Sequence, residues 1–115
     1  GADAEKSERG GGTGMITVYH DLYEGRHYLR VTGHADETNA AEGRRVCAAV
    51  SALAELLATE IAADKDAFAS LESGDALISW SGHEAVWNAL DKTFSRFAKD
   101  FSKNLCYTDG IWWAK

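Results

Sequence analysis

The sequence predicts an α/β domain, a two-layer sandwich in which two helices cover one face of an antiparallel or mixed sheet. Two runs of alternating apolar residues precede each of two stretches with helical apolar spacing, which gives the order ββαββα. Hairpins separated by helices favour this arrangement of layers. The 115 residues, 45% of them hydrophobic, suffice for one domain with its own core.

The N-terminal segment differs in composition from the rest of the chain. Residues 1–14 mix charged residues with a run of glycines and show no apolar periodicity. We therefore expect a disordered leader or a remnant of cloning over residues 1–14, and a folded domain over residues 15–115.

The first hairpin is predicted from the alternating runs Ile16–His20 and Tyr28–Thr32, which a turn around Glu24-Gly25 separates. Gly33 and His34 stand at the exit of its second strand. The segment that follows, from Ala35 to Gly43, is polar, has few apolar anchors and ends on a glycine. We expect it to form a mobile loop.

A helix of about five turns is predicted from Val46, because apolar residues recur to Ile61 at helical spacing. Two starts are open: one between Glu42 and Arg45, and one with Asn39 as the N-cap. Glycine is costly inside a helix, so Gly43 favours the later start.

A second hairpin is predicted from Ala67–Leu71 and Ala76–Trp80, joined by the turn residues Glu72-Ser73-Gly74-Asp75. Ser81 and Glu84 match a capping box at the start of a second helix. After that helix, Ile111-Trp112-Trp113 is expected to form a last short strand or an ordered tail. The apolar stripe of the second helix consists of Trp87, Leu90, Phe94, Phe97 and Phe101.

The charge and cysteine content narrow the class of partner and the location. A net charge of −6 argues against nucleic acid and favours a basic protein or peptide, although such a charge also keeps small domains soluble. No apolar run reaches the roughly 18 residues of a membrane span, and no signal peptide is visible. We expect a cytoplasmic protein without a membrane partner, whose two cysteines stay reduced.

One cysteine and one histidine suggest thiol chemistry. A cysteine becomes a useful nucleophile when a helix N-terminus and a nearby imidazole favour its thiolate. With the later helix start, Cys47 would lie in the first turn, thirteen positions after His34. The alternatives are a small buried residue for Cys47 and a loop histidine for His34.

The same region resembles the active-site segment of the Prp family, bacterial cysteine proteases that process a ribosomal protein. The matching residues are Met15–Val18, Gly33-His34-Ala35 and Val46–Leu53. The resemblance implies a homodimer in which Cys47 attacks a peptide carbonyl, His34 activates it, and the loop from Ala35 through Asp36 to Gly43 closes on substrate. It also implies that the substrate is an N-terminal extension of a ribosomal protein.

Supporting roles follow from these positions. The backbone N–H groups of Cys47 and Ala48 would stabilise the oxyanion, with Gly33 giving backbone room and Ser51 lying one turn beyond the thiol on the same face. The family usually has an aspartate three residues before its cysteine, where this chain has Arg44. Arg44 and Arg45 would instead add positive charge that favours a thiolate.

The sequence is also compatible with functions other than proteolysis. A dimeric module that binds peptide without cleaving it is the main alternative. A zinc site is disfavoured because its ligands would lack close paired spacing, so neither a metal nor a cofactor is expected. Trp112 and Trp113 could bind peptide, line a dimer interface or cover the core. The zinc ligands considered are His34, Cys47, His83 and Cys106.

Overall fold

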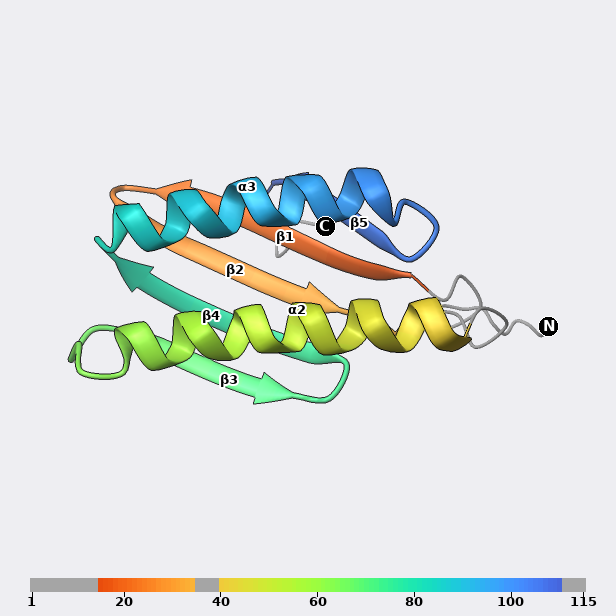
Figure 1. Cartoon of the computed structure of the whole chain (residues 1–115). Helices are drawn as coiled ribbons and strands as arrows, with labels where there is room; N and C mark the ends of the chain where they lie inside the picture. The colour runs from red at the N-terminus through yellow and green to blue at the C-terminus, as the bar shows by residue number, and fades with distance from the viewer. Residues whose placement is uncertain (1–14, 35–39, 111–115) are drawn as a thin grey trace, which may run out of the picture.

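The computed structural model describes residues 15–34 and 40–110, which form one five-stranded sheet with two helices on the same face (Figure 1). The strand order is β3-β4-β2-β1-β5; β5 runs parallel to β1, and the other neighbours are antiparallel. The predicted two-layer α/β fold with a mixed sheet is therefore confirmed. The elements are β1 (Ile16–Tyr23), β2 (Arg26–Thr32), α2 (Ala40–Ile61), β3 (Phe68–Glu72), β4 (Asp75–Ser81), α3 (Glu84–Asp100) and β5 (Leu105–Asp109).

Both predicted hairpins are present, and each closes through a two-residue turn. Glu24 and Gly25 join β1 to β2 with φ angles of 51° and 79°, the left-handed pair that suits a tight hairpin. Ser73 and Gly74 join β3 to β4, and Gly74 also has a positive φ of 79°. Because β2 pairs with β4, the two hairpins form one continuous sheet.

The structure has a strand after α3 that the sequence did not predict. Strand β5 covers Leu105–Asp109, whereas Ile111–Trp113, the predicted strand or tail, lies outside the described residues. The start of β5 is fixed by Asn104, whose carbonyl accepts a 2.9 Å hydrogen bond from the backbone N–H of Ile16. The pairing with β1 therefore depends on a contact between distant parts of the chain, which local periodicity does not reveal.

Helix α2 begins at Ala40, so the prediction of a start between Glu42 and Arg45 is wrong. Gly43, the predicted last residue of the mobile loop, lies inside the helix and is buried. Asn104 also donates a 2.7 Å hydrogen bond to Oε2 of Glu42, which anchors the first turn. Such contacts offset the roughly 1 kcal/mol that an interior glycine costs a helix.

Helix α3 begins at Glu84 without the predicted capping box, which is therefore also wrong. His83 occupies the N-cap position with a left-handed φ of 56° and makes no side-chain cap hydrogen bond. Ser81 is the last residue of β4 and lies outside the helix start. Glu84 turns its carboxylate to the ring of His27, so the helix start is held by contacts with other elements.

The core lies between the helices and the sheet. Helix α2 contacts β3 and β4, and helix α3 contacts β5, so each helix covers one half of the sheet (Figure 1). Neither helix combines the length and apolar character needed to span a membrane. The largest fully buried side chains include Trp80, Phe94, Leu29, Leu57, Ile61, Ile78 and Leu105.

Candidate functional site

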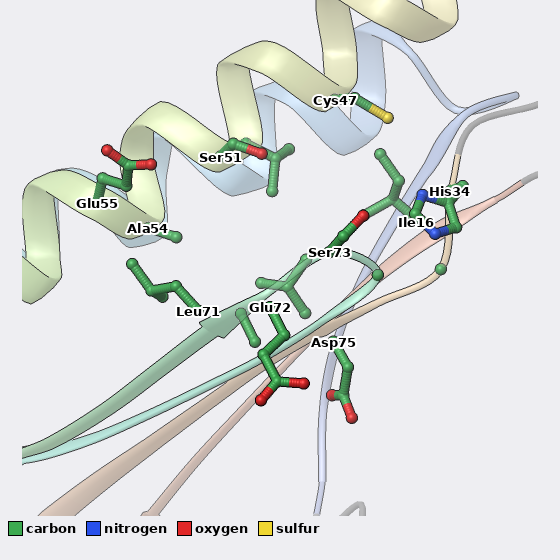
Figure 2. A pocket seen from close by; sticks show the side chains of 15 residues that line it. Ile16, His34, Cys47, Ser51, Ala54, Glu55, Leu71, Glu72, Ser73 and Asp75 are labelled. Carbon is green, nitrogen blue, oxygen red and sulfur yellow. The ribbon is translucent and has the colours of Figure 1, made fainter.

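A cavity of about 350 Å³ opens between α2 and the turn of the β3–β4 hairpin (Figure 2). Cys47 and His34 both line it, although they come from different elements: α2 and the end of β2. Apolar side chains from the sheet and α2 line its inner part. They include Ile16, Val31, Val50, Ala54, Leu71 and Ala76.

Cys47 is the eighth residue of α2, counted from Ala40, and its side chain is partly exposed. Figure 2 shows its sulfur pointing off the helix toward the side of the cavity where His34 lies. The thiol is free, and it packs against the edge of the core instead of lying inside it. The interpretation of Cys47 as a small buried residue is therefore met only in part.

His34 is exposed and follows Gly33 at the end of β2. Gly33 has a φ of 93°, and a Cβ there would collide with the carbonyl oxygen of Met15, so the predicted need for backbone room is met. Its N–H donates a 3.0 Å hydrogen bond to the carbonyl of Gly74. The His34 ring lies over Gly74, where a Cβ would come within 2.6 Å of Nε2. The hairpin turn thus leaves room for the imidazole.

The predicted oxyanion donors are wrong. In an α-helix only the first four N–H groups lack an intrahelical acceptor. Because α2 starts at Ala40, the N–H groups of Cys47 and Ala48 lie beyond these positions and bond within the helix. For the same reason, Cys47 is outside the first turn, where the helix dipole acts most strongly.

The remaining predicted site residues divide into those near the cavity and those away from it. Ser51 lines the cavity one turn after Cys47. Arg44 and Arg45 are exposed on α2 and do not line it. Ala35 and Asp36, from the predicted gating loop, lie outside the described residues.

Sequence reasoning missed the contribution of the second hairpin. Thr32 pairs with Asp75, which brings the turn at Ser73 beside Gly33 and His34. Figure 2 shows the Ser73 hydroxyl directed into the cavity, toward the side where the thiol lies. The turn itself was predicted, but the register between β2 and β4 has no local signal in the sequence.

Three residues that line the cavity carry carboxylates, but Figure 2 shows those of Glu72 and Asp75 directed away from the thiol. The carboxylate of Asp75 accepts two hydrogen bonds from Arg30, of 3.0 and 3.2 Å. Glu55 on α2 and Glu72 on β3 are exposed, and neither forms an ion pair with another residue of the described segments. Glu55 and Glu72 therefore leave negative charge near β3 that no described ion partner neutralises.

A second histidine group lies at the other end of the sheet. His27 stacks on Trp80. Its Nδ1 forms a 2.9 Å hydrogen bond with Nε2 of His20. Its Nε2 lies 2.8 Å from the Glu84 carboxylate, so Nε2 carries the proton and, in a neutral ring, Nδ1 accepts from His20. Burial and the nearby His27 ring lower the pKa of His20 to about 4.

His83 lies apart from the cavity and binds two carboxylates of the α2 end. Its ring nitrogens are 2.6 Å from Asp64 and 3.1 Å from Glu60, and these bonds raise the pKa of His83. Cys106 is exposed on β5. Within residues 15–34 and 40–110, no group of three or more His, Cys, Asp or Glu side chains is arranged to hold a metal ion.

Comparisons with known proteins bear on the fold. No family model matches the chain, and no curated protein matches it. Among solved structures, the chain is similar to SMU.848 from Streptococcus mutans, with a TM-score of 0.60 and 19% sequence identity. The match covers 83% of this chain and 96% of that one. At this identity the likeness supports the two-layer fold alone.

Proposed function

We propose that this protein is a cytoplasmic cysteine endopeptidase that removes a short extension from a protein substrate. The observation that carries the proposal is the cavity shared by a free thiol, Cys47, and an exposed imidazole, His34. Neither the Cys47 thiol nor the His34 ring forms a hydrogen bond with another described residue. The resemblance of Gly33-His34-Ala35 and Val46–Leu53 to the Prp family supports a ribosomal-protein extension as substrate and a homodimer as the working form.

The proposed reaction is acyl transfer through a thioester. His34 accepts the proton of the Cys47 thiol, and the thiolate forms a bond to the carbonyl carbon of the scissile peptide. The tetrahedral adduct collapses with cleavage of the C–N bond, and the imidazolium gives its proton to the leaving amine. Water, deprotonated by His34, then hydrolyses the thioester to release the acid and restore the thiol.

The oxyanion of this reaction needs a donor other than the helix backbone. Ser73 is the candidate, because its hydroxyl points into the cavity from the hairpin turn, while Ser51 lines the cavity from α2 (Figure 2). Loss of one oxyanion donor typically costs about a hundredfold in rate. We expect Ser73→Ala to lower kcat by about this factor.

Cleavage is tested with synthetic peptides that match N-terminal extensions of ribosomal proteins, followed by mass analysis of the products. The unsubstituted chain should release two defined fragments, and Cys47→Ser should release none. Cys106→Ser is the matched control, since it removes the other free thiol at an exposed position on β5. Equal cleavage by the Cys47→Ser protein would show that the thiol is not the nucleophile.

A dimeric peptide-binding module without catalysis is the second candidate. The start of α2 at Ala40 favours it, because Cys47 then lies beyond the first turn. Arg44, in place of the aspartate usual in the resembled family, favours it as well. The rate of Cys47 alkylation by iodoacetamide across pH separates the two candidates: only the protease requires a rate that falls in His34→Ala.

A further inference from the structure

Strand β3 forms an edge of the sheet, and its outer side has no partner strand among the described residues. It is the last strand in the order β3-β4-β2-β1-β5 and pairs with β4 alone. Every residue of β3 except Ser70 is exposed. The strand also lacks the lysine or proline with which sheet edges are commonly protected from additional strands.

The register identifies which backbone groups of β3 are free. A β-turn closes through the hydrogen bond between its first and fourth residues, here Glu72 and Asp75. Hydrogen-bonded pairs alternate along an antiparallel ladder. The next residue that points its N–H and C=O away from β4 is therefore Leu71, followed by Ala69.

This edge continues into the cavity that holds the thiol. Leu71 and Glu72 belong to β3 and also line the cavity with Cys47 and His34. A chain paired with β3 would therefore reach the reactive groups at the hairpin end.

The side chains along the edge define the chemistry of the occupant. Successive residues of a strand face opposite sides, so Leu71 faces the helix layer while Phe68 and Glu72 face the open side. Leu71 is 43% exposed and Phe68 is 52% exposed, so each side offers an apolar contact. Glu55 on α2 and Glu72 on β3 add negative charge without a described ion partner.

We propose that the outer edge of β3 binds an extended peptide with alternating apolar and basic residues, which adds a sixth strand and leads its backbone to Cys47 and His34. The proposal deepens the proposed function, on which its catalytic meaning rests. Backbone hydrogen bonds would supply affinity, and the acidic residues would select the basic side chains. A second copy paired through its own β3 fits less well, because this strand carries a glutamate and no basic residue that would match it.

The test uses the Cys47→Ser protein and a fluorescein-labelled peptide of alternating lysine and valine, about seven residues long. Ala69→Pro removes an outward N–H at a position where an edge strand tolerates proline. Ala69→Thr is the matched control, since it keeps the N–H and suits a strand. We expect binding to weaken about tenfold in Ala69→Pro and to stay unchanged in Ala69→Thr.

A second measurement leaves the protein unaltered and so remains valid if Ala69→Pro fails to fold. Peptides N-methylated at alternate positions fall into two sets, of which only one points its N–H groups at β3. One set should lose affinity and the other should retain it. Equal affinity of both sets, or no binding of the parent peptide, overturns the proposal.

The outcomes separate this inference from the protease proposal. Alternating sensitivity to N-methylation, with no cleavage of any ribosomal peptide by the unsubstituted chain, leaves the edge site standing and removes the protease. Cleavage by the Ala69→Pro protein with the same KM as the unsubstituted chain would support the protease and remove the edge site. If sedimentation shows that Ala69→Pro dissociates a dimer while peptide affinity is unchanged, the occupant is a second copy, and the peptide proposal is wrong.

Discussion

The histidines at the two ends of the sheet lie in opposite environments: one is buried and hydrogen-bonded, and the other is exposed. At one end, His27 is 1% exposed, stacks on Trp80 and has a partner at each ring nitrogen. At the other end, His34 is exposed over the hairpin turn and bonds to no described residue. A histidine whose nitrogens are both engaged contributes to packing and orientation, whereas a free, exposed ring beside a cavity can exchange a proton with a thiol.

The largest expected effect is a difference in folding stability between variants of these two histidines. His27→Ala should lower the free energy of unfolding by about 3 kcal/mol, because it leaves a cavity beside Trp80 and an unpaired His20 nitrogen. His34→Ala should change it by less than about 0.5 kcal/mol, as is usual at an exposed position. Urea denaturation at neutral pH measures both. A similar loss in the two variants would mean that His34 is also structural.

The second prediction concerns the backbone that supports His34. Gly33→Ala should cost more than about 2 kcal/mol, since alanine disfavours the positive φ and its Cβ would meet the backbone of Met15. Gly82→Ala is the control at a φ of 75° with no atom near the added Cβ, and should cost about 1 kcal/mol. Equal midpoints in urea for the two variants would contradict the close approach at Gly33.

The third prediction isolates the position of the His34 ring. Gly74→Ala and Gly25→Ala both place alanine at a φ of 79°, so each should lose about 1 kcal/mol of stability. Only at Gly74 does the new Cβ meet the imidazole, which must rotate away. We expect the NMR signals of His34 to move in Gly74→Ala alone, and peptide cleavage to fall about a hundredfold. Unmoved His34 signals would refute this packing.

The last prediction is a pH dependence of stability at the buried end. The pKa of His20 is lowered to about 4 in the folded chain, against an unfolded value of 6.5. Its neutral form therefore stabilises the fold above pH 6.5, and this contribution is lost as the pH falls from 6.5 toward 4. His20→Gln should flatten that part of the stability profile, measured by urea denaturation at successive pH values. Parallel profiles would contradict the shift.

His83 provides a contrast of opposite sign. Its pKa is raised by the hydrogen bonds to Asp64 and Glu60, so its contribution is full below pH 6.5 and is lost as the pH rises through the folded pKa. His83→Gln should therefore alter the profile on the alkaline side, where His20→Gln leaves it unchanged.

Local patterns in the sequence were sufficient for most of the fold. Alternation predicted the β1–β2 hairpin, and spacing predicted the stripe of α3 in which Trp87, Leu90 and Phe94 are buried. The earlier of the two possible α2 starts was disfavoured and β5 was not predicted, because both depend on Asn104 and its contacts with distant residues. The capping box failed for a similar reason: His83 and Glu84 bond to other elements instead of to the helix start.

The candidate site was predictable only in part. The motifs selected Cys47 and His34, which the structure brings to one cavity, and their catalytic roles stay predictions. Ser73 was not selected, since its place depends on the pairing of β2 with β4. The prediction of the oxyanion donors was wrong because it relied on the later of two candidate helix starts. The unfavourable free energy of one glycine, Gly43, was not enough to exclude the earlier start. A helix start has to be known to within one turn before backbone donors can be assigned.

The anchoring of α2 by Asn104 has a consequence for synthesis on the ribosome. Asn104 follows Glu42 by 62 positions, so the hydrogen bond between them cannot form until the chain through Asn104 has left the exit tunnel. Strand β5, which follows Asn104 directly, completes the sheet at the same late stage. The helix that carries the thiol is therefore anchored only after residue 104 has emerged from the ribosome, and a chain truncated before Asn104 would carry its cysteine on an unanchored helix.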